Sequence, residues 1–467
     1  MTPPSVELKR LVLLAVLAGG CGGGNPDPVA PGPPPPPITT LVVTPLLATV
    51  TSGETVAARA TGRTAQGTTA AVTVTWQSSD PAVAAVTSTG TVTAAGNGTA
   101  TITATTGSVS ASLAIRVAPP GLERIVDSVR RAYGLPAMGG AIVTRAGTEA
   151  LAVAGTRRAS GGPAVTGSDK WHIGSNLKAI TSALAGIAVD HGKLSWATTV
   201  AEGLPDLATT IRPQYRDVTL GDLLSHRAGI RNDPPASAFG GATAQEQRAS
   251  LVGWALTVPP AGPVGTFSYS NLGYVVAAAM VERAWSEPYE GLLTSRLLQP
   301  LGITGLGWGP QAAAGSSDQP VAHSYQNGTW VPCEGCDNPP GLSAAGRAHL
   351  PLGDWAKLIR EFLAAYDGTS TLLSPATGRA LFTARVPLAD TDGYSLGWVL
   401  VTRSWAGGPA ATHEGTNTVN HSVAWLGLGR GIGVIAVTNA ADLTTGQTSL
   451  ALDGLVGRML GYHDTGR

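Results

Sequence analysis

The chain has 467 residues, which is too many for one ordinary hydrophobic core, so two or more domains are expected. Its formal net charge is zero and only 13% of its residues are charged, which excludes the basic surface that nucleic-acid binding requires. Five residues in the whole chain are lysines, so the position of each lysine is informative.

Residues 1–21 have the pattern of a bacterial lipoprotein signal peptide. Lys9 and Arg10 precede an apolar run, Leu11–Ala18, that is too short to span a bilayer as a mature helix. Small residues then lead directly to Cys21, which would carry the lipid after cleavage. The alternative is an ordinary secretory signal with an incidental cysteine. Both interpretations predict export, and the first predicts a lipid-anchored protein of the bacterial cell envelope, in the periplasm or at the outer surface.

Two segments with no predicted catalytic residues follow the signal peptide. Residues 22–37 consist largely of Gly and Pro, which predicts a stiff linker that holds the body away from the membrane. Residues 38–118 contain short runs such as Val72–Trp76 and Ala100–Ala104 that alternate apolar and polar side chains between turn signals. This alternation predicts a small all-β antiparallel sandwich, which we interpret as a spacer rather than a ligand-binding module.

The sequence pattern of residues 119–467 predicts a single unit that contains both α-helices and β-strands. Strands are expected near both ends of this unit, and the long middle, about 200 to 390, is expected to hold a helical region. The arrangement predicts one antiparallel sheet, built from both ends of the unit and flanked by helices. The expected elements are helices over 122–133 and 449–460, a hairpin of 141–145 with 150–154, and strands over 395–401, 422–426 and 432–437.

Cys333 and Cys336 form a Cys-x-x-Cys pair, which is compatible with redox catalysis, half a zinc site or a local disulfide. No second ligand pair accompanies them, and the surrounding Gly and Pro residues indicate a loop rather than the start of a helix. In an exported protein, a disulfide that closes the loop is the favoured interpretation.

Ser175 and Lys178 carry the strongest chemical signal. Between Ile173 and Val189 the only charged residue is Lys178, in a run whose apolar residues recur at helical spacing, so this helix should be buried. An unpaired buried ammonium is costly, so Lys178 must be paired, neutral or both. Ser175 lies one turn earlier, at the helix N-terminus, where a desolvated lysine can activate its hydroxyl for acyl transfer.

Three motifs in order resemble the serine β-lactamase family, which includes class C β-lactamases, D-Ala-D-Ala carboxypeptidases, D-aminopeptidases and esterases. The resemblance runs from about residue 122 to 462. It rests on Trp171-His172-Ile173-Gly174-Ser175-Asn176-Leu177-Lys178, on Tyr269-Ser270-Asn271 and on His413-Glu414-Gly415-Thr416. A second Tyr-x-Asn match, Tyr325-Gln326-Asn327, is interpreted as a turn. Residues 38–118 in turn resemble the bacterial Ig-like domain family (group 2).

The family resemblance implies a role for each motif residue. Ser175 would be acylated, Lys178 and Tyr269 would share the acid and base work, and the Lys178 charge would favour a tyrosinate. Asn271 would orient the substrate or Lys178, and His413 would replace a lysine that many family members have. The backbone N–H groups of Ser175 and Thr416 would form the oxyanion hole, and the segment Glu414-Gly415-Thr416 would contact the substrate. His226, in contrast, is expected to have a structural role.

Glu414 stands where many β-lactamases and carboxypeptidases have Thr or Ser to bind the carboxylate of the substrate. Its own carboxylate would repel such a substrate, so neutral or cationic esters and amides are expected in place of β-lactams. The alternative is that Glu414 only points to solvent.

The predicted function is that of a serine hydrolase acting through an acyl-serine intermediate on an ester, amide or D-amino-acid peptide. One alternative is a catalytically silent penicillin-binding-like surface protein that binds cell-wall peptides, and another is an adhesion protein dominated by the Ig-like domain. No metal or organic cofactor is implied. The expected partners are a small-molecule or peptide acyl substrate, the membrane through the lipid anchor, and the cell wall, but no nucleic acid.

Overall fold

The computed structural model describes residues 37–465, apart from residues 52, 97, 119, 120, 160 and 443. The predicted signal peptide, the lipid-carrying Cys21 and all but the last residue of the predicted linker lie outside the described residues. The chain divides into two compact units between Val117 and Ala118, and each unit has its own hydrophobic core.

The first unit is all β, as the alternating pattern predicts. Alternation places one side chain of each pair inward, so that Ile102, Leu113 and Ile115 are buried in the core while the intervening residues face outward. Its strands form sheets in the orders β1-β4-β5, β2-β10-β9-β6 and β3-β8-β7. The strands are β1 (Ile38–Thr44), β2 (Leu47–Thr51), β3 (Thr55–Ala57), β4 (Arg59–Thr64), β5 (Thr69–Ala70), β6 (Thr75–Ser78), β7 (Ala84–Val86), β8 (Thr91–Ala94), β9 (Gly98–Thr106) and β10 (Val109–Ala118).

The second unit is organised around a seven-stranded antiparallel sheet with the order β12-β11-β22-β21-β20-β19-β18. Strands from the start and the end of the unit pair where β11 meets β22, which confirms the predicted sheet built from both ends. The strands of this sheet are β11 (Ala137–Thr144), β12 (Gly147–Gly155), β18 (Gly393–Tyr394), β19 (Val399–Arg403), β20 (Gly408–Thr416), β21 (His421–Gly427) and β22 (Ile432–Thr438).

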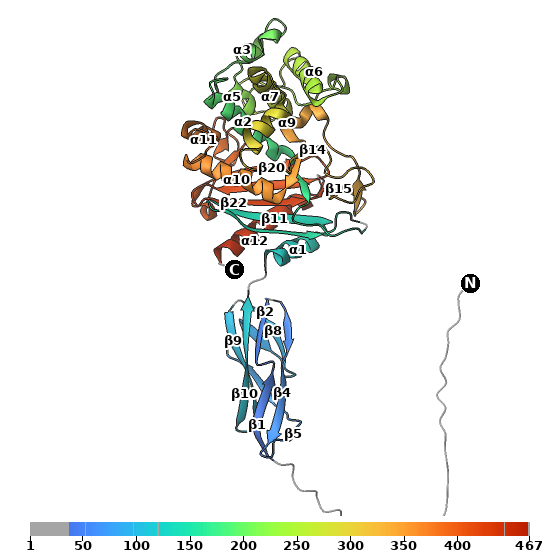
Figure 1. Cartoon of the computed structure of the whole chain (residues 1–467), viewed down its shortest axis with the longest axis vertical. Helices are drawn as coiled ribbons and strands as arrows, with labels where there is room; N and C mark the ends of the chain where they lie inside the picture. The colour runs from blue at the N-terminus through green and yellow to red at the C-terminus, as the bar shows by residue number, and fades with distance from the viewer. Residues whose placement is uncertain are drawn as a thin grey trace, which may run out of the picture. The chain divides into compact units, whose positions relative to one another are not determined.

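Helices cover both faces of this sheet. Figure 1 shows α10 on one face and α1 with α12 on the other, while α2, α3, α5, α6, α7 and α9 gather above the α10 face. The α-helices are α1 (Leu122–Ala132), α2 (Leu177–Asp190), α3 (Val200–Gly203), α4 (Pro213–Arg216), α5 (Leu220–Leu224), α6 (Ala244–Thr257), α7 (Asn271–Trp285), α8 (Tyr289–Leu293), α9 (Ser343–Gly346), α10 (Leu352–Asp367), α11 (Pro375–Leu381) and α12 (Gln447–Asp464). No helix in the described part of the chain is long and apolar enough to cross a membrane.

Short elements connect these layers. Two further small sheets have the orders β13-β17-β14 and β16-β15-β23. Their strands are β13 (Lys170–His172), β14 (Gly307–Trp308), β15 (Ala322–Gln326), β16 (Thr329–Cys333), β17 (Ala348–Pro351) and β23 (Ala440–Ala441). The short helical turns are η1 (Gly174–Asn176), η2 (Pro205–Leu207), η3 (Ala236–Ala238), η4 (Thr294–Leu298), η5 (Pro340–Leu342) and η6 (Ser404–Ala406).

Two expectations for the middle and the end of the unit are corrected. The region 200–390 is not only helical, because β14 to β17 lie within it. The segment 395–401 is not one strand, because β18 ends at Tyr394 and β19 begins at Val399. The turn between them passes so close to α2 that a Cβ on Gly397 would lie 2.7 Å from Cα of Ala179. From the sequence, an apolar run of this kind is predicted to be a strand, but in the structure its first part is a tight turn.

A buried ion cluster anchors the helices around α2. The guanidinium of Arg248, on α6, is fully buried and contacts Glu282 at 2.5 Å and Glu290 at 3.0 Å. Burial alone would lower the pKa of Arg248, but hydrogen bonds to the two carboxylates raise it above its ordinary value. Arg248 also donates to Oγ of Ser343 at 2.7 Å, which ties the first residue of α9 to α6.

Replacing Arg248 by Met should destabilise the second unit by about 3–5 kcal/mol, because two partly buried carboxylates lose their fully buried cation. Urea unfolding followed by tryptophan fluorescence measures this unit, since all tryptophans except Trp76 lie in it. The matched control is Arg283→Met, which removes a solvent-exposed pair with Asp206 and should cost less than about 1 kcal/mol. Equal losses in both variants would contradict the buried-cluster account.

Candidate active site

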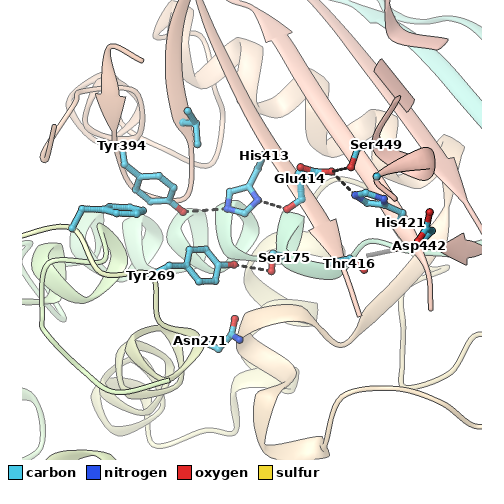
Figure 2. A pocket seen from close by; sticks show the side chains of 13 residues that line it. Ser175, Tyr269, Asn271, Tyr394, His413, Glu414, Thr416, His421, Asp442 and Ser449 are labelled. Carbon is cyan, nitrogen blue, oxygen red and sulfur yellow. Dashed lines mark hydrogen bonds and ion pairs between the residues drawn. The ribbon is translucent and has the colours of Figure 1, made fainter. Parts of the chain in front are cut away.

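The residues predicted for chemistry come together at one pocket of about 630 Å³ between strands β19 to β21 of the seven-stranded sheet and the helical layer. A pocket of this size accommodates a small-molecule or short peptide ligand. Figure 2 shows side chains entering it from η1, from the start of α7 and from the end of β20. Six of the predicted residues line its wall: Ser175, Tyr269, Asn271, His413, Glu414 and Thr416. Gly415 lies between two of them on β20.

Lys178 lies directly behind Ser175 and has three polar neighbours. Its Nζ is 3.0 Å from Oγ of Ser175, 2.7 Å from Oδ1 of Asn271 and 2.7 Å from the backbone carbonyl oxygen of Ala345. The two short contacts come from α7 and α9, so two helices far apart in the sequence hold one amine against the serine hydroxyl. Tyr269 completes the cluster, because its phenol donates a hydrogen bond to Oγ of Ser175 at 2.8 Å.

Burial determines the charge states of this cluster. Lys178 is fully buried and has no carboxylate partner among its contacts, and desolvation lowers its pKa well below its ordinary value. Desolvation also raises the pKa of Tyr269 to about 12. The raised pKa of Tyr269 contradicts the expected tyrosinate. Desolvation favours the neutral form of both groups, although Tyr269 is 37% exposed at the pocket wall whereas Lys178 is fully buried.

Two glycines allow the serine turn and the end of β20 to touch. Gly174 has φ +50°, and a Cβ at this position would lie 2.4 Å from the backbone nitrogen of Thr416. A Cβ on Gly415 would lie 2.8 Å from the backbone nitrogen of Ser175. Any larger residue at either position would push the strand away. The backbone nitrogens of Ser175 and Thr416 consequently both lie at the close contact between the serine turn and the end of β20.

His413 is buried and uncharged at neutral pH. Desolvation lowers its pKa to about 4. Its Nδ1–H donates to the backbone oxygen of Glu414 at 2.7 Å, so its Nε2 is free to accept a hydrogen bond from the Tyr394 hydroxyl at 3.2 Å. Both contacts are visible in Figure 2. His413 therefore presents a neutral ring where a lysine would present a charge.

Glu414 does not simply point to solvent, although its side chain is 54% exposed. Its carboxylate pairs with Nε2 of His421 and accepts a hydrogen bond from Oγ of Ser449 at 3.0 Å (Figure 2). The hydrogen bond from His421 holds the pKa of this carboxylate below its ordinary value, so Glu414 is charged at neutral pH. His421 and Ser449 were not predicted, since neither belongs to a recognisable motif.

A second group that the sequence did not reveal supports the serine turn from behind. His172 accepts a hydrogen bond at Nδ1 from the amide of Gly174 at 3.1 Å, while its Nε2 lies 2.9 Å from Oδ1 of Asp337. The same carboxylate oxygen accepts a hydrogen bond from the side-chain amide of Asn417 at 2.9 Å, directly after Thr416. Burial alone would raise the pKa of Asp337, but the contacts with His172 hold this pKa below its ordinary value. Asp337 thus links the backbone on both sides of the pocket.

The disulfide of the structure lies next to Asp337. Cys333 and Cys336 are joined, as the loop interpretation of this pair expects, and they close the turn that leads into Asp337. Asp337 is 165 residues from His172 (337 minus 172), and no local pattern connects them. The disulfide therefore stabilises a loop that contributes to the support of the active site.

The remaining predicted residues have structural roles. His226 has φ +58°, accepts a hydrogen bond from the amide of Ser270 at 3.1 Å and packs its ring 4.3 Å from that of Tyr269, so it orients the tyrosine. The segment Tyr325-Gln326-Asn327 ends β15, and Asn327 forms the turn into β16 with φ +48°. Among the described residues, no group of three His, Cys, Asp or Glu side chains is arranged to hold a metal ion.

The site thus places one serine hydroxyl against an amine and a phenol, and comparisons with known proteins show the family to which this unit belongs. Residues 122–455 match the family model Beta-lactamase, and residues 37–117 match the Bacterial Ig-like domain (group 2). Penicillin-binding protein 4 of Amycolatopsis lactamdurans is 28% identical over 347 residues, which cover 72% of this chain and 88% of that protein.

Two further proteins are similar over the same unit. An unguisins hydrolase of Aspergillus campestris is 26% identical over 321 residues, which cover 64% of this chain but only 56% of that protein. The solved structure of the octameric penicillin-binding protein homologue from Pyrococcus abyssi superposes with a TM-score of 0.61 at 20% identity, covering 73% of this chain and 77% of that one. The latter likeness establishes the fold alone.

Asp337→Asn should slow the labelling of Ser175 by a fluorophosphonate about 10- to 100-fold, because loss of the charged partner lets the serine turn and the end of β20 move apart. Labelling is followed by gel fluorescence against time, with circular dichroism to verify folding. Asp318→Asn, at an exposed carboxylate that contacts Ser316, is the matched control and should label at the rate of the unmodified protein. Labelling of Asp337→Asn at the same rate as this control would exclude the positioning role.

Proposed function

This chain belongs to the beta-lactamase family, and on that premise we propose that it is a serine hydrolase in which Ser175 forms a covalent acyl intermediate. The proposed substrates are esters, amides or D-amino-acid peptides. The observation that carries the proposal is the contact of one serine hydroxyl with both the Lys178 amine and the Tyr269 phenol, at 3.0 and 2.8 Å.

The hydrogen bonds around Lys178 support a base role for this residue and an acid role for Tyr269. A neutral amine has two N–H bonds and one lone pair, and the carbonyl oxygens of Asn271 and Ala345 can only accept. These two oxygens take both N–H bonds of Lys178, which leaves the lone pair directed at Ser175. Because the Tyr269 phenol donates to the same serine oxygen, the serine hydrogen is directed at Lys178. Lys178 is therefore the base and Tyr269 the acid in the proposed acylation.

In the proposed acylation, Oγ of Ser175 attacks the carbonyl carbon of the substrate while its proton passes to Lys178. The tetrahedral intermediate then breaks its bond to the leaving group, which takes the phenolic proton of Tyr269. In the second half-reaction water attacks the acyl carbon and gives a proton to the Tyr269 phenolate, and Lys178 returns its proton to Oγ of Ser175 as the bond between the acyl carbon and Oγ breaks, so that both side chains are neutral again. The adjacent amides of Ser175 and Thr416, brought together at Gly174 and Gly415, support an oxyanion hole that accepts the developing negative charge.

The N-terminal pattern carries a proposal about location. Residues 1–21 have the features of a lipoprotein signal peptide, and we propose that Cys21 anchors the protein to a membrane of the bacterial cell envelope. The all-β unit would then act as a spacer between the anchor and the enzyme, where contact with the cell wall becomes available. A catalytically silent receptor for cell-wall peptides is the alternative function, although such a receptor would not require a buried amine at Ser175.

Labelling with a fluorescent penicillin and with a fluorophosphonate tests the covalent step. We expect at least one of the reagents to label the protein at Ser175, with Ser175→Ala unlabelled, and p-nitrophenyl butyrate to be hydrolysed faster than nitrocefin. Mass spectrometry of the trapped protein locates the adduct. Absence of label with both reagents and of ester hydrolysis would favour the silent receptor, and efficient nitrocefin turnover would contradict the substrate preference.

The pH dependence of kcat/KM should show a broad plateau. Lys178 acts in its neutral form, so activity should be lost only as the pH falls through its lowered pKa. Tyr269 acts in its protonated form, so activity should also be lost as the pH rises through about 12. A tyrosinate base would instead give a rate that increases toward alkaline pH, and a profile of that shape would rule out the assigned roles.

Lys178→Arg provides the matched test of the base. A guanidinium stays protonated over the accessible pH range and should reduce kcat/KM by roughly 100- to 10,000-fold, with no recovery at high pH. Lys357→Arg, at a partly exposed lysine paired with Asp354, should retain the activity and the profile of the unmodified enzyme.

A further inference from the structure

Glu414 has a place in the pocket that bears on substrate selection. We propose that its carboxylate occupies the hydrogen-bond donors of His421 and Ser449 and thereby excludes acyl substrates whose leaving group carries a carboxylate. The inference rests on the proposed hydrolase function and names the substrate class as neutral or cationic esters and amides. Glu414 would then be a specificity-determining residue rather than a catalytic one.

Strand geometry places Glu414 beside the reacting centre. Side chains two residues apart on a strand lie on the same face, so Glu414 and Thr416 lie on one face of β20. His421 of the neighbouring strand β21 lies on that same face of the sheet. His421 pairs with Thr416 across the sheet, and both line the pocket together with Glu414. A substrate whose oxyanion binds at the Thr416 amide therefore extends its neighbouring groups past Glu414.

The contact with Glu414 fixes which nitrogen of His421 carries a proton. An ionised carboxylate can only accept a hydrogen bond, so Nε2 of His421 carries a hydrogen. On the other side of the ring, the hydroxyl of Thr448 lies 2.8 Å from Nδ1 and accepts a hydrogen bond from the amide of Asp442 at 3.3 Å. The Nε2–H of His421 is directed at the Glu414 carboxylate.

Helix α12 supplies the second donor. Ser449 lies in the first turn of this 18-residue helix and donates to Glu414 at 3.0 Å. The partial positive charge of a helix N-terminus stabilises a carboxylate at this position. The protein thus contains a small anion site formed by His421, Ser449 and the start of α12, and its own Glu414 carboxylate fills that site.

The charges around the pocket add to this exclusion. Among the described residues, neither a lysine nor an arginine lines the pocket, whereas the carboxylates of Glu414 and Asp442 do. Desolvation lowers the pKa of His413 to about 4, so this ring is neutral at physiological pH, and it lowers the pKa of Lys178 behind the serine. A substrate carboxylate would therefore meet a filled donor pair and two carboxylates, with no lysine or arginine in the pocket lining to offset them. A neutral or cationic group in the same place meets no such penalty.

Glu414→Thr tests the inference with a pair of esters that differ only in one carboxylate, phenyl acetate and meta-carboxyphenyl acetate. The variant frees both donors and removes one charge, so the ratio of kcat/KM for the charged ester to that for the neutral ester should rise about 10-fold or more. Glu414→Asp retains the charge and should leave the ratio close to that of the unmodified enzyme. If Glu414→Thr does not fold, Glu414→Gln removes the charge with nearly the same shape and should raise the ratio in the same direction.

Glu149→Gln is the matched control, because Glu149 pairs with His463 at the other end of α12, at 2.9 Å, and does not line the pocket. In Glu149→Gln, the ratio of kcat/KM for the charged ester to that for the neutral ester should equal that of the unmodified enzyme. If the unmodified enzyme hydrolyses phenyl acetate and the ratio is unchanged in the folded Thr or Gln variant, the inference is overturned. If the unmodified enzyme hydrolyses neither ester and Ser175 is not labelled by a fluorophosphonate, it is the proposed function that fails.

Discussion

The burial of one amine is the constraint on which the rest of the site depends. Lys178 is fully buried on an otherwise apolar helix, and a charged ammonium there would need a carboxylate that none of its contacts supplies. Desolvation favours the neutral amine, and in the proposed mechanism its two N–H bonds are taken by Asn271 and Ala345. The remaining lone pair would then face Ser175, so the desolvation that disfavours the charge would also make Lys178 the base.

That arrangement requires the carbonyl oxygen of Ala345 to stay in place, and the surrounding structure holds it. Ser343 fixes the start of α9 through hydrogen bonds with the buried Arg248 and with Glu290. Thr181, one turn after Lys178 on α2, donates to the carbonyl oxygen of Ala344 at 2.8 Å. Ionic groups deep in the helical layer therefore act on the chemistry only through backbone position. The opposite side is held in the same way by Asp337, which joins the Gly174 turn to the end of β20.

Local patterns predicted much of this structure, and distant contacts account for what they missed. Helical spacing and a lone lysine were enough to place Lys178 on a buried helix with Ser175 just before it, in the turn η1, and alternation identified the sheet and the all-β unit. The tyrosinate expected for Tyr269 was wrong because no local pattern around this residue shows that its phenol is desolvated. Asp337, Arg248 and His421 lie in unremarkable segments, and they matter only because the fold brings each against a residue far away in the chain.

The most direct test of the central claim is the titration of Lys178 itself. The chain has only five lysines, so NMR of protein with an isotopic label at lysine Cε gives few signals, and Lys178→Arg assigns the one of interest. The account predicts that this signal titrates well below the ordinary pKa of 10.5, with the amine neutral at physiological pH. A Lys178 signal that titrates at 10.5 or higher would contradict it, because an ammonium beside Ser175 cannot accept the serine proton.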